Sequence, residues 1–209
     1  MLVKICGVTR AEDAEAAAEA GAAAVGFVFW PGSPRFVDPF RARAIAAKLP
    51  PFVTPVGVFV NQAADYITSV ASLVRLGAVQ LHGDEPPEAA DELPMPVIKA
   101  MTVGDARLAS WPARMTILLD SHDPVKRGGT GRPIDWDAAA EVAAGRRILL
   151  AGGLTPDNVA EAVARVRPFG IDVSSGVERA PGVKDPQRIR ALFASMKAAM
   201  VHGRLETIR

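Results

Sequence analysis

The sequence predicts an α/β fold in which a single domain, residues 1–209, forms a compact (β/α)8 TIM barrel. The first observation is that eight short apolar runs alternate with helical patterns from end to end. The second is the length of 209 residues, close to the lower size of about 200 for that barrel. The third is that Cys6-Gly7-Val8-Thr9 follows the first run. It lacks the G-x-G-x-x-G pattern of an open nucleotide-binding sheet, the alternative architecture.

The eight apolar runs predict the strands of the barrel. Each is short, is rich in β-branched or large apolar residues, and is followed by a helix or a segment in the place of one. Such an order implies parallel strands joined by right-handed crossovers. The predicted strands are Leu2–Cys6, Ala24–Phe29, Pro55–Val60, Ala78–His82, Val97–Met101, Met115–Asp120, Arg147–Ala151 and Ile171–Ser174.

Helices are predicted from capping patterns and from apolar stripes at helical spacing. The predicted helix starts are a capping box of Thr9 with Glu12, and the pairs Asp38-Pro39, Thr155-Pro156 and Asp185-Pro186. The apolar stripes are Tyr66, Ile67, Val70, Leu73 and Val74, and then Ile189, Leu192, Phe193 and Met196. Residues 104–110 have room for a short helix only, and residues 201–209 carry no motif and are expected to form a tail.

Composition excludes several classes of protein. The 24 basic and 23 acidic residues are interspersed, which argues against a nucleic-acid surface or a polybasic membrane surface. The one cysteine excludes an intrachain disulfide and any cysteine-built metal site. The N-terminus lacks the apolar stretch of a signal peptide, and the longest uncharged apolar stretch, around Ala20 to Pro34, is too short to span a bilayer. We therefore expect a cytoplasmic protein with no nucleic-acid or membrane partner.

Polar residues gather at the ends of the predicted strands. Cys6, His82, Asp120 and Ser174-Ser175 all lie there, and the chemistry of this barrel takes place at the C-terminal ends of its strands. Alternation along the first strand places Lys4 on the same side as Cys6, inside the barrel, where a charge needs a partner. Asp172 on the last strand is the predicted partner, and a structural ion pair is at least as well supported as a catalytic lysine.

Three glycine-rich turns follow the sixth, seventh and eighth predicted strands. They are Gly128-Gly129-Thr130-Gly131, Ala151-Gly152-Gly153-Leu154 and Ser174-Ser175-Gly176-Val177. Glycine lets backbone N–H groups surround a phosphate, and the loops after strands seven and eight are the usual phosphate site of the barrel. The substrate is therefore expected to be a small phosphorylated molecule.

The ordered set of motifs resembles the phosphoribosylanthranilate isomerase family from the first residues to Glu178. The motifs that carry the resemblance are Lys4-Ile5-Cys6-Gly7, Gly26-Phe27-Val28-Phe29 with Ser33-Pro34-Arg35, Gly57-Val58-Phe59-Val60, Gln80-Leu81-His82-Gly83, Leu118-Leu119-Asp120-Ser121, the Gly128–Gly131 turn, Leu150-Ala151-Gly152-Gly153-Leu154, and Asp172-Val173-Ser174-Ser175-Gly176-Val177-Glu178. Any one tetrapeptide is weak, but the ordered set is specific.

The resemblance implies an Amadori rearrangement in tryptophan biosynthesis, with Asp120 as general acid and Cys6 as general base. It implies that Arg35 binds the anthranilate carboxylate, and that no metal or cofactor is required. Residues expected on the phosphate and ribose side are Gly129, Gly152, Gly153, Asp172, Ser174, Ser175 and Gly176. The protein is expected to be a monomer or a homodimer. His82 and His122 are interpreted as structural or substrate-lining residues.

The chemistry also predicts how the two catalytic groups are tuned. A free cysteine ionises near ~8.5, so a base at neutral pH favours a lowered pKa. A free aspartate ionises near ~3.9, so an acid needs desolvation to keep its proton.

Three alternatives remain open. One is an isomerase of histidine biosynthesis on the same fold, for which an acidic residue is expected in place of Cys6. The others are a metal-dependent sugar-phosphate epimerase and a non-catalytic phosphate-binding module.

Overall fold

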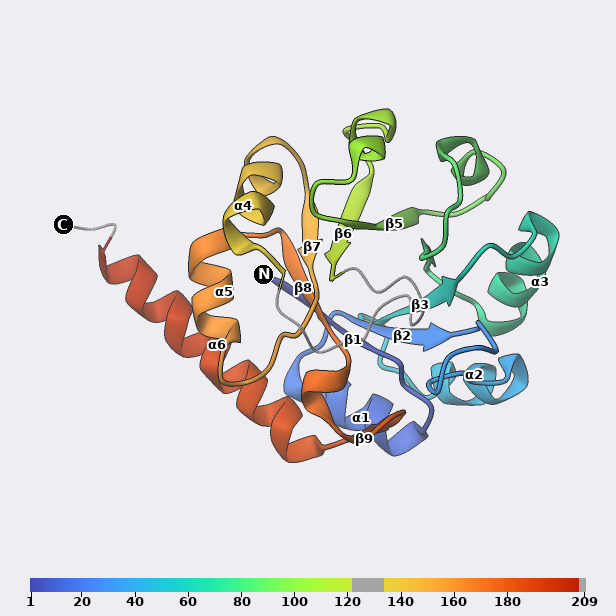
Figure 1. Ribbon diagram of the computed structural model, residues 1–209. Helices are drawn as coiled ribbons and strands as arrows, with labels where there is room; N and C mark the ends of the chain where they lie inside the picture. Colours follow the sequence, from blue (N-terminus) through green and yellow to red (C-terminus); the bar gives the residue numbers. More distant parts are fainter. Residues whose placement is uncertain (122–133, 207–209) are drawn as a thin grey trace.

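The eight strands close into a barrel in the computed structural model, which describes residues 1–121 and 134–206 (Figure 1). Each strand pairs in parallel with the next, and β8 pairs with β1. The strands are Leu2–Cys6 (β1), Ala24–Val28 (β2), Thr54–Phe59 (β3), Ala78–Leu81 (β4), Val97–Thr102 (β5), Thr116–Asp120 (β6), Ile148–Leu150 (β7) and Gly170–Val173 (β8). The predicted barrel is confirmed, and each strand begins and ends within one residue of its prediction.

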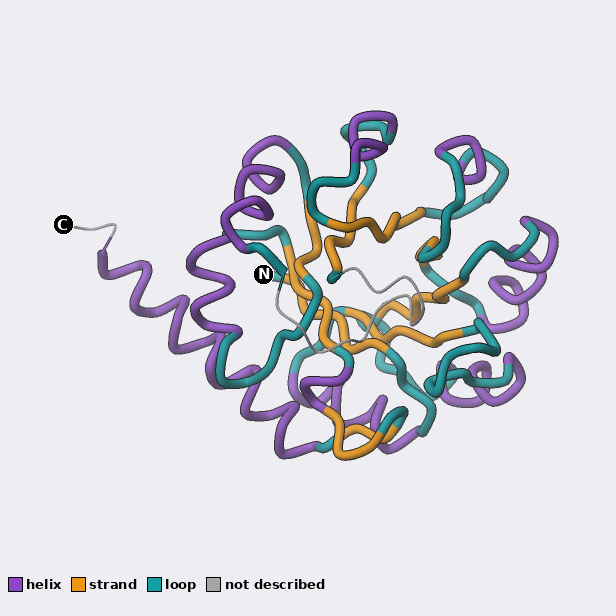
Figure 2. Tube along the Cα trace, viewed as in Figure 1, coloured by secondary structure: helices purple, strands orange, loops and turns teal. Residues whose placement is uncertain are grey.

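Helices surround the barrel, as Figure 2 shows. The α-helices are Ala11–Ala20 (α1), Pro39–Ala46 (α2), Ala64–Val74 (α3), Trp136–Gly145 (α4), Val159–Val166 (α5) and Pro186–Glu206 (α6). Short 3-10 helices, Pro87–Ala90 (η1) and Ala106–Ser110 (η2), follow β4 and β5 in place of longer ones, and Ser175–Val177 (η3) follows β8. The short helix predicted within residues 104–110 is therefore confirmed. Within the described part of the chain, no helix is long and apolar enough to cross a membrane.

Two of the four predicted helix starts are confirmed. Asp38 accepts hydrogen bonds from the first free N–H groups of α2, and Asp185 does the same for α6. The capping box of Thr9 is wrong, because the Thr9 hydroxyl instead donates to the carbonyl of Gly182, 2.6 Å away. The start at Thr155-Pro156 is also wrong, because a turn precedes α5, which begins at Val159.

The C-terminal part of the chain differs from its prediction in two ways. Helix α6 continues to Glu206, so most of the expected tail at 201–209 is helical, in keeping with the helix-forming residues that precede it. A hairpin of Glu178–Ala180 (β9) and Val183–Lys184 (β10), which the sequence did not predict, lies between β8 and α6. Its turn contains Gly182 at φ 77°, a left-handed conformation that favours glycine.

Side chains on the two faces of the strands pack into two separate cores. The larger core lies between barrel and helices, and the odd-numbered residues of β1, Val3 and Ile5, are buried in it. The inside of the barrel holds smaller apolar clusters, one of which contains Cys6. Lys4 and Cys6 therefore face the barrel interior, as the alternation of β1 predicted.

Candidate active site at the C-terminal mouth of the barrel

The strand ends bring the predicted acid and a histidine together. Asp120 is the last residue of β6, and His82 directly follows β4. The Nε2 atom of His82 lies 3.7 Å from Oδ2 of Asp120. The other carboxylate oxygen, Oδ1, accepts a hydrogen bond of 2.7 Å from the backbone N–H of Ser121.

Burial keeps the carboxyl group of Asp120 protonated to a higher pH than usual. Its side chain is 13 % exposed. Desolvation raises the pKa of Asp120 to about 6, against the lowering effect of the hydrogen bond from Ser121. The prediction that this acid is desolvated is confirmed.

Cys6 is buried beside two lysines and a carboxylate. Burial raises the pKa of the Cys6 thiol, and the Asp172 carboxylate raises it further, whereas the ammonium groups of Lys4 and Lys184 lower it. The expectation of a lowered pKa is therefore wrong in direction, because desolvation outweighs the nearby positive charge. The residue is 8 % exposed.

Lys4 has the partner that the sequence predicted. Its Nζ lies 2.8 Å from Oδ1 of Asp172, and both side chains are buried. Burial disfavours the ammonium, but the charges and hydrogen bonds of Asp172 and Cys6 together outweigh it and raise the pKa of Lys4. A side chain at Gly26 would collide with this arrangement, since its Cβ would lie 2.8 Å from Sγ of Cys6 and 3.1 Å from Nζ of Lys4.

Arg35 is held by Glu178 of the hairpin. The Nε and Nη2 atoms of Arg35 donate to the two oxygens of Glu178 at 3.0 and 2.8 Å. Lys184 donates to the same carboxylate at 2.7 Å and also to Ser174. Burial opposes the charge on Glu178, but the two cations outweigh it and lower the pKa of Glu178.

The arrangement around Arg35 includes residues that the sequence analysis missed. Glu178 ends the Asp172–Glu178 motif, but that motif predicts no role for it. Lys184 has no signal in the sequence beyond its charge. Lys184 is fully buried. The backbone of Gly7 lies against Arg35, since a Cβ there would come within 2.5 Å of Cδ of the arginine.

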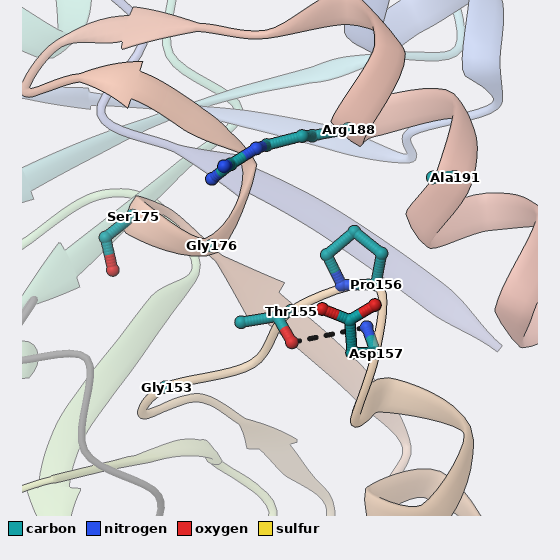
Figure 3. A pocket seen from close by; sticks show the side chains of 8 residues that line it. All are labelled: Gly153, Thr155, Pro156, Asp157, Ser175, Gly176, Arg188 and Ala191. Atoms are coloured by element: carbon teal, nitrogen blue, oxygen red, sulfur yellow. Dashed lines mark hydrogen bonds between the residues drawn. The ribbon is translucent and has the colours of Figure 1, made fainter.

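A cavity of about 470 Å³ lies between the two glycine turns that follow β7 and β8 (Figure 3). Its lining residues are Gly153, Thr155, Pro156, Asp157, Ser175, Gly176, Arg188 and Ala191. Only glycine fits at position 176, because a Cβ there would lie 1.8 Å from the carbonyl oxygen of Leu154. The backbones of the two turns are thus in direct contact at Gly176 and Leu154.

The other residues predicted for the substrate differ in their positions. Gly152 lies beside the acid, since a Cβ there would be 3.3 Å from Oδ1 of Asp120. The hydroxyl of Ser174 donates to the carbonyl of Cys6 at 3.0 Å. Gly129 and His122 lie outside the described residues.

Arg188 lines the same cavity and was not predicted. Figure 3 shows its guanidinium reaching from α6 toward the turn of Gly176, and its Nη1 donates to the carbonyl of Glu178 at 3.1 Å. The Asp185-Pro186 start of α6 precedes this cation in the sequence. Its contact with Glu178 and the direction of its side chain are properties of the folded chain.

Comparisons with known proteins identify the family of this chain. The family model described as N-(5'phosphoribosyl)anthranilate (PRA) isomerase matches residues 3–195. A curated protein of Trichlorobacter lovleyi, named N-(5'-phosphoribosyl)anthranilate isomerase, is 50% identical over 202 residues, covering 95% of this chain and 98% of its own.

Two solved structures add to this. A phosphoribosyl anthranilate isomerase in complex with reduced 1-(o-carboxyphenylamino)-1-deoxyribulose 5-phosphate has a TM-score of 0.84 and 44% identity, covering 95% of this chain and 100% of its own. The structure of monomers generated from the dimeric phosphoribosylanthranilate isomerase of Thermotoga maritima has a TM-score of 0.85 and 42% identity, with the same coverage. With a family model matching nearly the whole barrel, this chain belongs to the N-(5'-phosphoribosyl)anthranilate isomerase family.

Proposed function

We propose that this protein converts N-(5-phosphoribosyl)anthranilate to 1-(2-carboxyphenylamino)-1-deoxyribulose 5-phosphate, the third step from chorismate to tryptophan. The observation that carries the proposal is a desolvated carboxyl group at the end of β6 and a thiol at the end of β1, both beside glycine turns suited to a phosphate. The reaction is an Amadori rearrangement, an internal redox change in which C2 is oxidised and C1 reduced, so it consumes no external oxidant.

Asp120 is the general acid of the proposed mechanism. It gives its proton to the ring oxygen of the ribose while the lone pair of the anilino nitrogen forms the C1=N bond and the C1–O bond breaks. The N–H of Ser121 occupies Oδ1, which leaves Oδ2 as the oxygen that carries the proton. The raised pKa of Asp120 supports this role, because it keeps more of the acid form near neutral pH.

Cys6 is the general base. Its thiolate takes the proton from C2, the C2–H electron pair forms the C1=C2 bond, and the C1=N π electrons return to nitrogen. The enol that results becomes the ketone when C1 gains a proton and the C2 hydroxyl loses one. Lys4 favours the thiolate through charge and hydrogen bonding. We further infer a cytoplasmic location, because this thiol has to stay reduced to act as a base.

Arg35 binds the anthranilate carboxylate in this proposal. Glu178 holds its Nε and Nη2 edge and thereby orients the rest of the guanidinium fork toward an incoming carboxylate. The substrate phosphate is bound by N–H groups of the Gly152-Gly153 and Ser175-Gly176 turns. Gly129, Asp172 and Ser174 remain predictions for the ribose and phosphate side, and the last two contact Lys4 and Cys6 within the protein.

We infer that the protein is a homodimer joined through the N-terminal face of its barrel. Phe52, just before β3, is 94% exposed. It stands at an apolar cavity of about 410 Å³ whose lining also includes Leu2, Pro96 and Phe169. A second copy related by a two-fold axis would cover both the cavity and Phe52, and the Thermotoga maritima relative is described as dimeric.

Genetic complementation tests the proposed activity. The gene is introduced into a tryptophan-requiring strain that lacks this isomerase and, in parallel, into a histidine-requiring strain that lacks the isomerase of that pathway. We expect the gene to restore growth of the tryptophan-requiring strain only. The Cys6→Ser and Asp120→Asn variants should restore growth of neither strain. Growth of the histidine-requiring strain would favour a second substrate, and growth of neither would contradict the proposal.

A further inference from the structure

Gln80 and His82 form a polar pair beneath the mouth of the barrel. They are two residues apart, so that their side chains point to the same side of the chain. Gln80 is fully buried, and its Nε2 lies 2.8 Å from Nδ1 of His82. Among the described residues, its other amide atom, Oε1, has no hydrogen-bond partner. An apolar side chain would avoid this unpaired acceptor, so the fold alone does not account for the glutamine.

The pair fixes which nitrogen of His82 carries the proton. An amide nitrogen can only donate a hydrogen bond, so Nδ1 of His82 has to accept. In a neutral imidazole the proton then lies on Nε2. That Nε2 atom is the one that lies 3.7 Å from Oδ2 of Asp120. The glutamine therefore determines whether the histidine presents an N–H or a lone pair to the acid.

We propose that Gln80 holds His82 in the Nε2–H tautomer, and that this N–H stabilises the Asp120 carboxylate as Oδ2 gives up its proton. The inference rests on the proposed role of Asp120 as the acid. At 3.7 Å the contact is longer than a hydrogen bond, so it adds little while Oδ2 is protonated. When charge develops on Oδ2, the N–H donor becomes a hydrogen-bond partner, so it favours the transition state over the ground state.

The opposite tautomer would work against the reaction. It would direct the lone pair of Nε2 at Oδ2, where it would accept the proton that the substrate needs. Because Oδ1 is already bound to Ser121, the acid could not shift its proton to the other oxygen without losing that bond. Gln80 and His82 are thus positioning residues that act on the substrate through Asp120.

NMR tests the tautomer without any assay of activity. The protein is labelled with 15N-histidine, and the His82 signals are assigned by their absence in His82→Gln, since the chain has three histidines. At a pH at which the ring is neutral, we expect a protonated Nε2 and an unprotonated Nδ1. Gln80→Met should abolish this preference. A protonated Nδ1 in the wild type would overturn the proposal, whatever the activity of the enzyme.

Kinetics tests the effect on the acid. His82→Leu removes the N–H, so we expect kcat to fall ~10²-fold, the typical effect of losing one such donor, with KM little changed. The apparent pKa of Asp120 in the kcat/KM profile should rise, because its carboxylate has lost a donor. His82→Gln carries an amide N–H that can reach the same point, so we expect it to restore most of kcat and the profile.

Two comparisons separate this role from a structural one. Gln80→Met removes the unpaired Oε1, so we expect equal or greater resistance to urea together with a lower kcat. In an Asp120→Asn background, His82→Leu should cause no further loss, because the acid on which it acts is gone. A loss of kcat that follows the loss of stability, or an undiminished effect of His82→Leu in that background, would overturn the proposal. An active Asp120→Asn enzyme would instead contradict the proposed function.

Discussion

In the proposed mechanism Asp120 has to be buried to act as an acid, and that burial destabilises the folded protein at neutral pH. Its folded pKa of about 6 lies above its value of ~3.9 in an unfolded chain. A group whose pKa is raised by folding adds stability below its unfolded pKa, and this stability is lost as pH rises through the folded pKa. The ionised carboxylate of Asp120 therefore lowers the free energy of unfolding at neutral pH.

Asp120→Asn should separate activity from stability. We expect kcat to fall by ~10² to 10⁴-fold, as for the loss of a general acid. The free energy of unfolding at pH 8 should rise by up to about 3 kcal/mol, because two pKa units of unfavourable ionisation are removed. Urea unfolding of both proteins at pH 8 and near pH 4 measures this. The gain should shrink toward pH 4, and an equal difference at both pH values would mean that ionisation of Asp120 is not its cause.

Cys6 and Asp120 ionise in an order that shapes the pH profile. In the proposed mechanism the reactive form has a protonated Asp120 and an ionised Cys6. The pKa of Asp120, however, lies near 6, and that of the Cys6 thiol lies above its usual range. Between the two pKa values the population of this form is small and does not change with pH. It decreases below the lower pKa and above the higher one. We therefore expect kcat/KM to be flat at neutral pH and to decline below about pH 6.

Because Cys6 is the only cysteine, alkylation with iodoacetamide reports on it directly. The rate of labelling should still be rising at pH values above ~8.5, where an ordinary thiol is half ionised. Substrate-like phosphates should slow it, and Cys6→Ser should bind them but turn over very slowly. Labelling that levels off below that pH would contradict the raised pKa, and an active Cys6→Ser enzyme would remove Cys6 from the mechanism.

At the scale of elements, the hairpin of β9 and β10 supports Arg35 at the mouth of the barrel. Glu178 joins Arg35 and the fully buried Lys184. Glu178→Gln leaves Lys184 buried without its counter-charge, so we expect a loss of ~3–5 kcal/mol in the free energy of unfolding. Arg35→Ala should instead keep Lys184 paired and mainly raise KM. Urea unfolding and specificity constants of both variants test this, and equal KM values for Arg35→Ala and the wild type would mean that the carboxylate is bound elsewhere.

The elements that were predicted correctly are those whose signal is local. The strands were found because their apolar runs are bounded by turns, and Asp38 and Asp185 were found because a cap acts on the next few residues. Thr9 has the same kind of pattern, but Gly182 competes for its hydroxyl from the far end of the chain. The hairpin strands, only three and two residues long, are too short for periodicity to reveal.

The residues of the candidate site show the same difference between local signals and contacts distant in sequence. Strand ends identified Cys6 and Asp120, and alternation identified the partner of Lys4. The roles of Lys184 and Gln80 depend on burial, and that of Arg188 depends on the cavity that distant segments form with it, which no local pattern encodes. The direction of the pKa shift of Cys6 was missed for the same reason, since it follows from how deeply the thiol is buried.

At the scale of the whole molecule, the two ends of the barrel have different tasks. Chemistry is proposed for the C-terminal mouth, whereas the N-terminal face carries the apolar cavity and the exposed ring of Phe52. Stability and assembly can therefore change at one end while the other end keeps its geometry. A dimer formed through the N-terminal face would leave both mouths open to substrate.

Phe52→Glu tests this arrangement, because it places a charge in an interface that would bury the ring. Light scattering after size-exclusion chromatography should give the mass of two chains for the wild type and of one chain for the variant. Phe40→Glu is the matched control, since Phe40 is also an exposed phenylalanine, 69% exposed, but does not line the cavity. It should remain dimeric.

The Phe52→Glu monomer should keep its kcat and unfold at a lower temperature, because the energy of association is lost while the C-terminal mouth keeps its structure. A wild type with the mass of one chain, or a Phe52→Glu variant with the mass of two, would contradict the dimer.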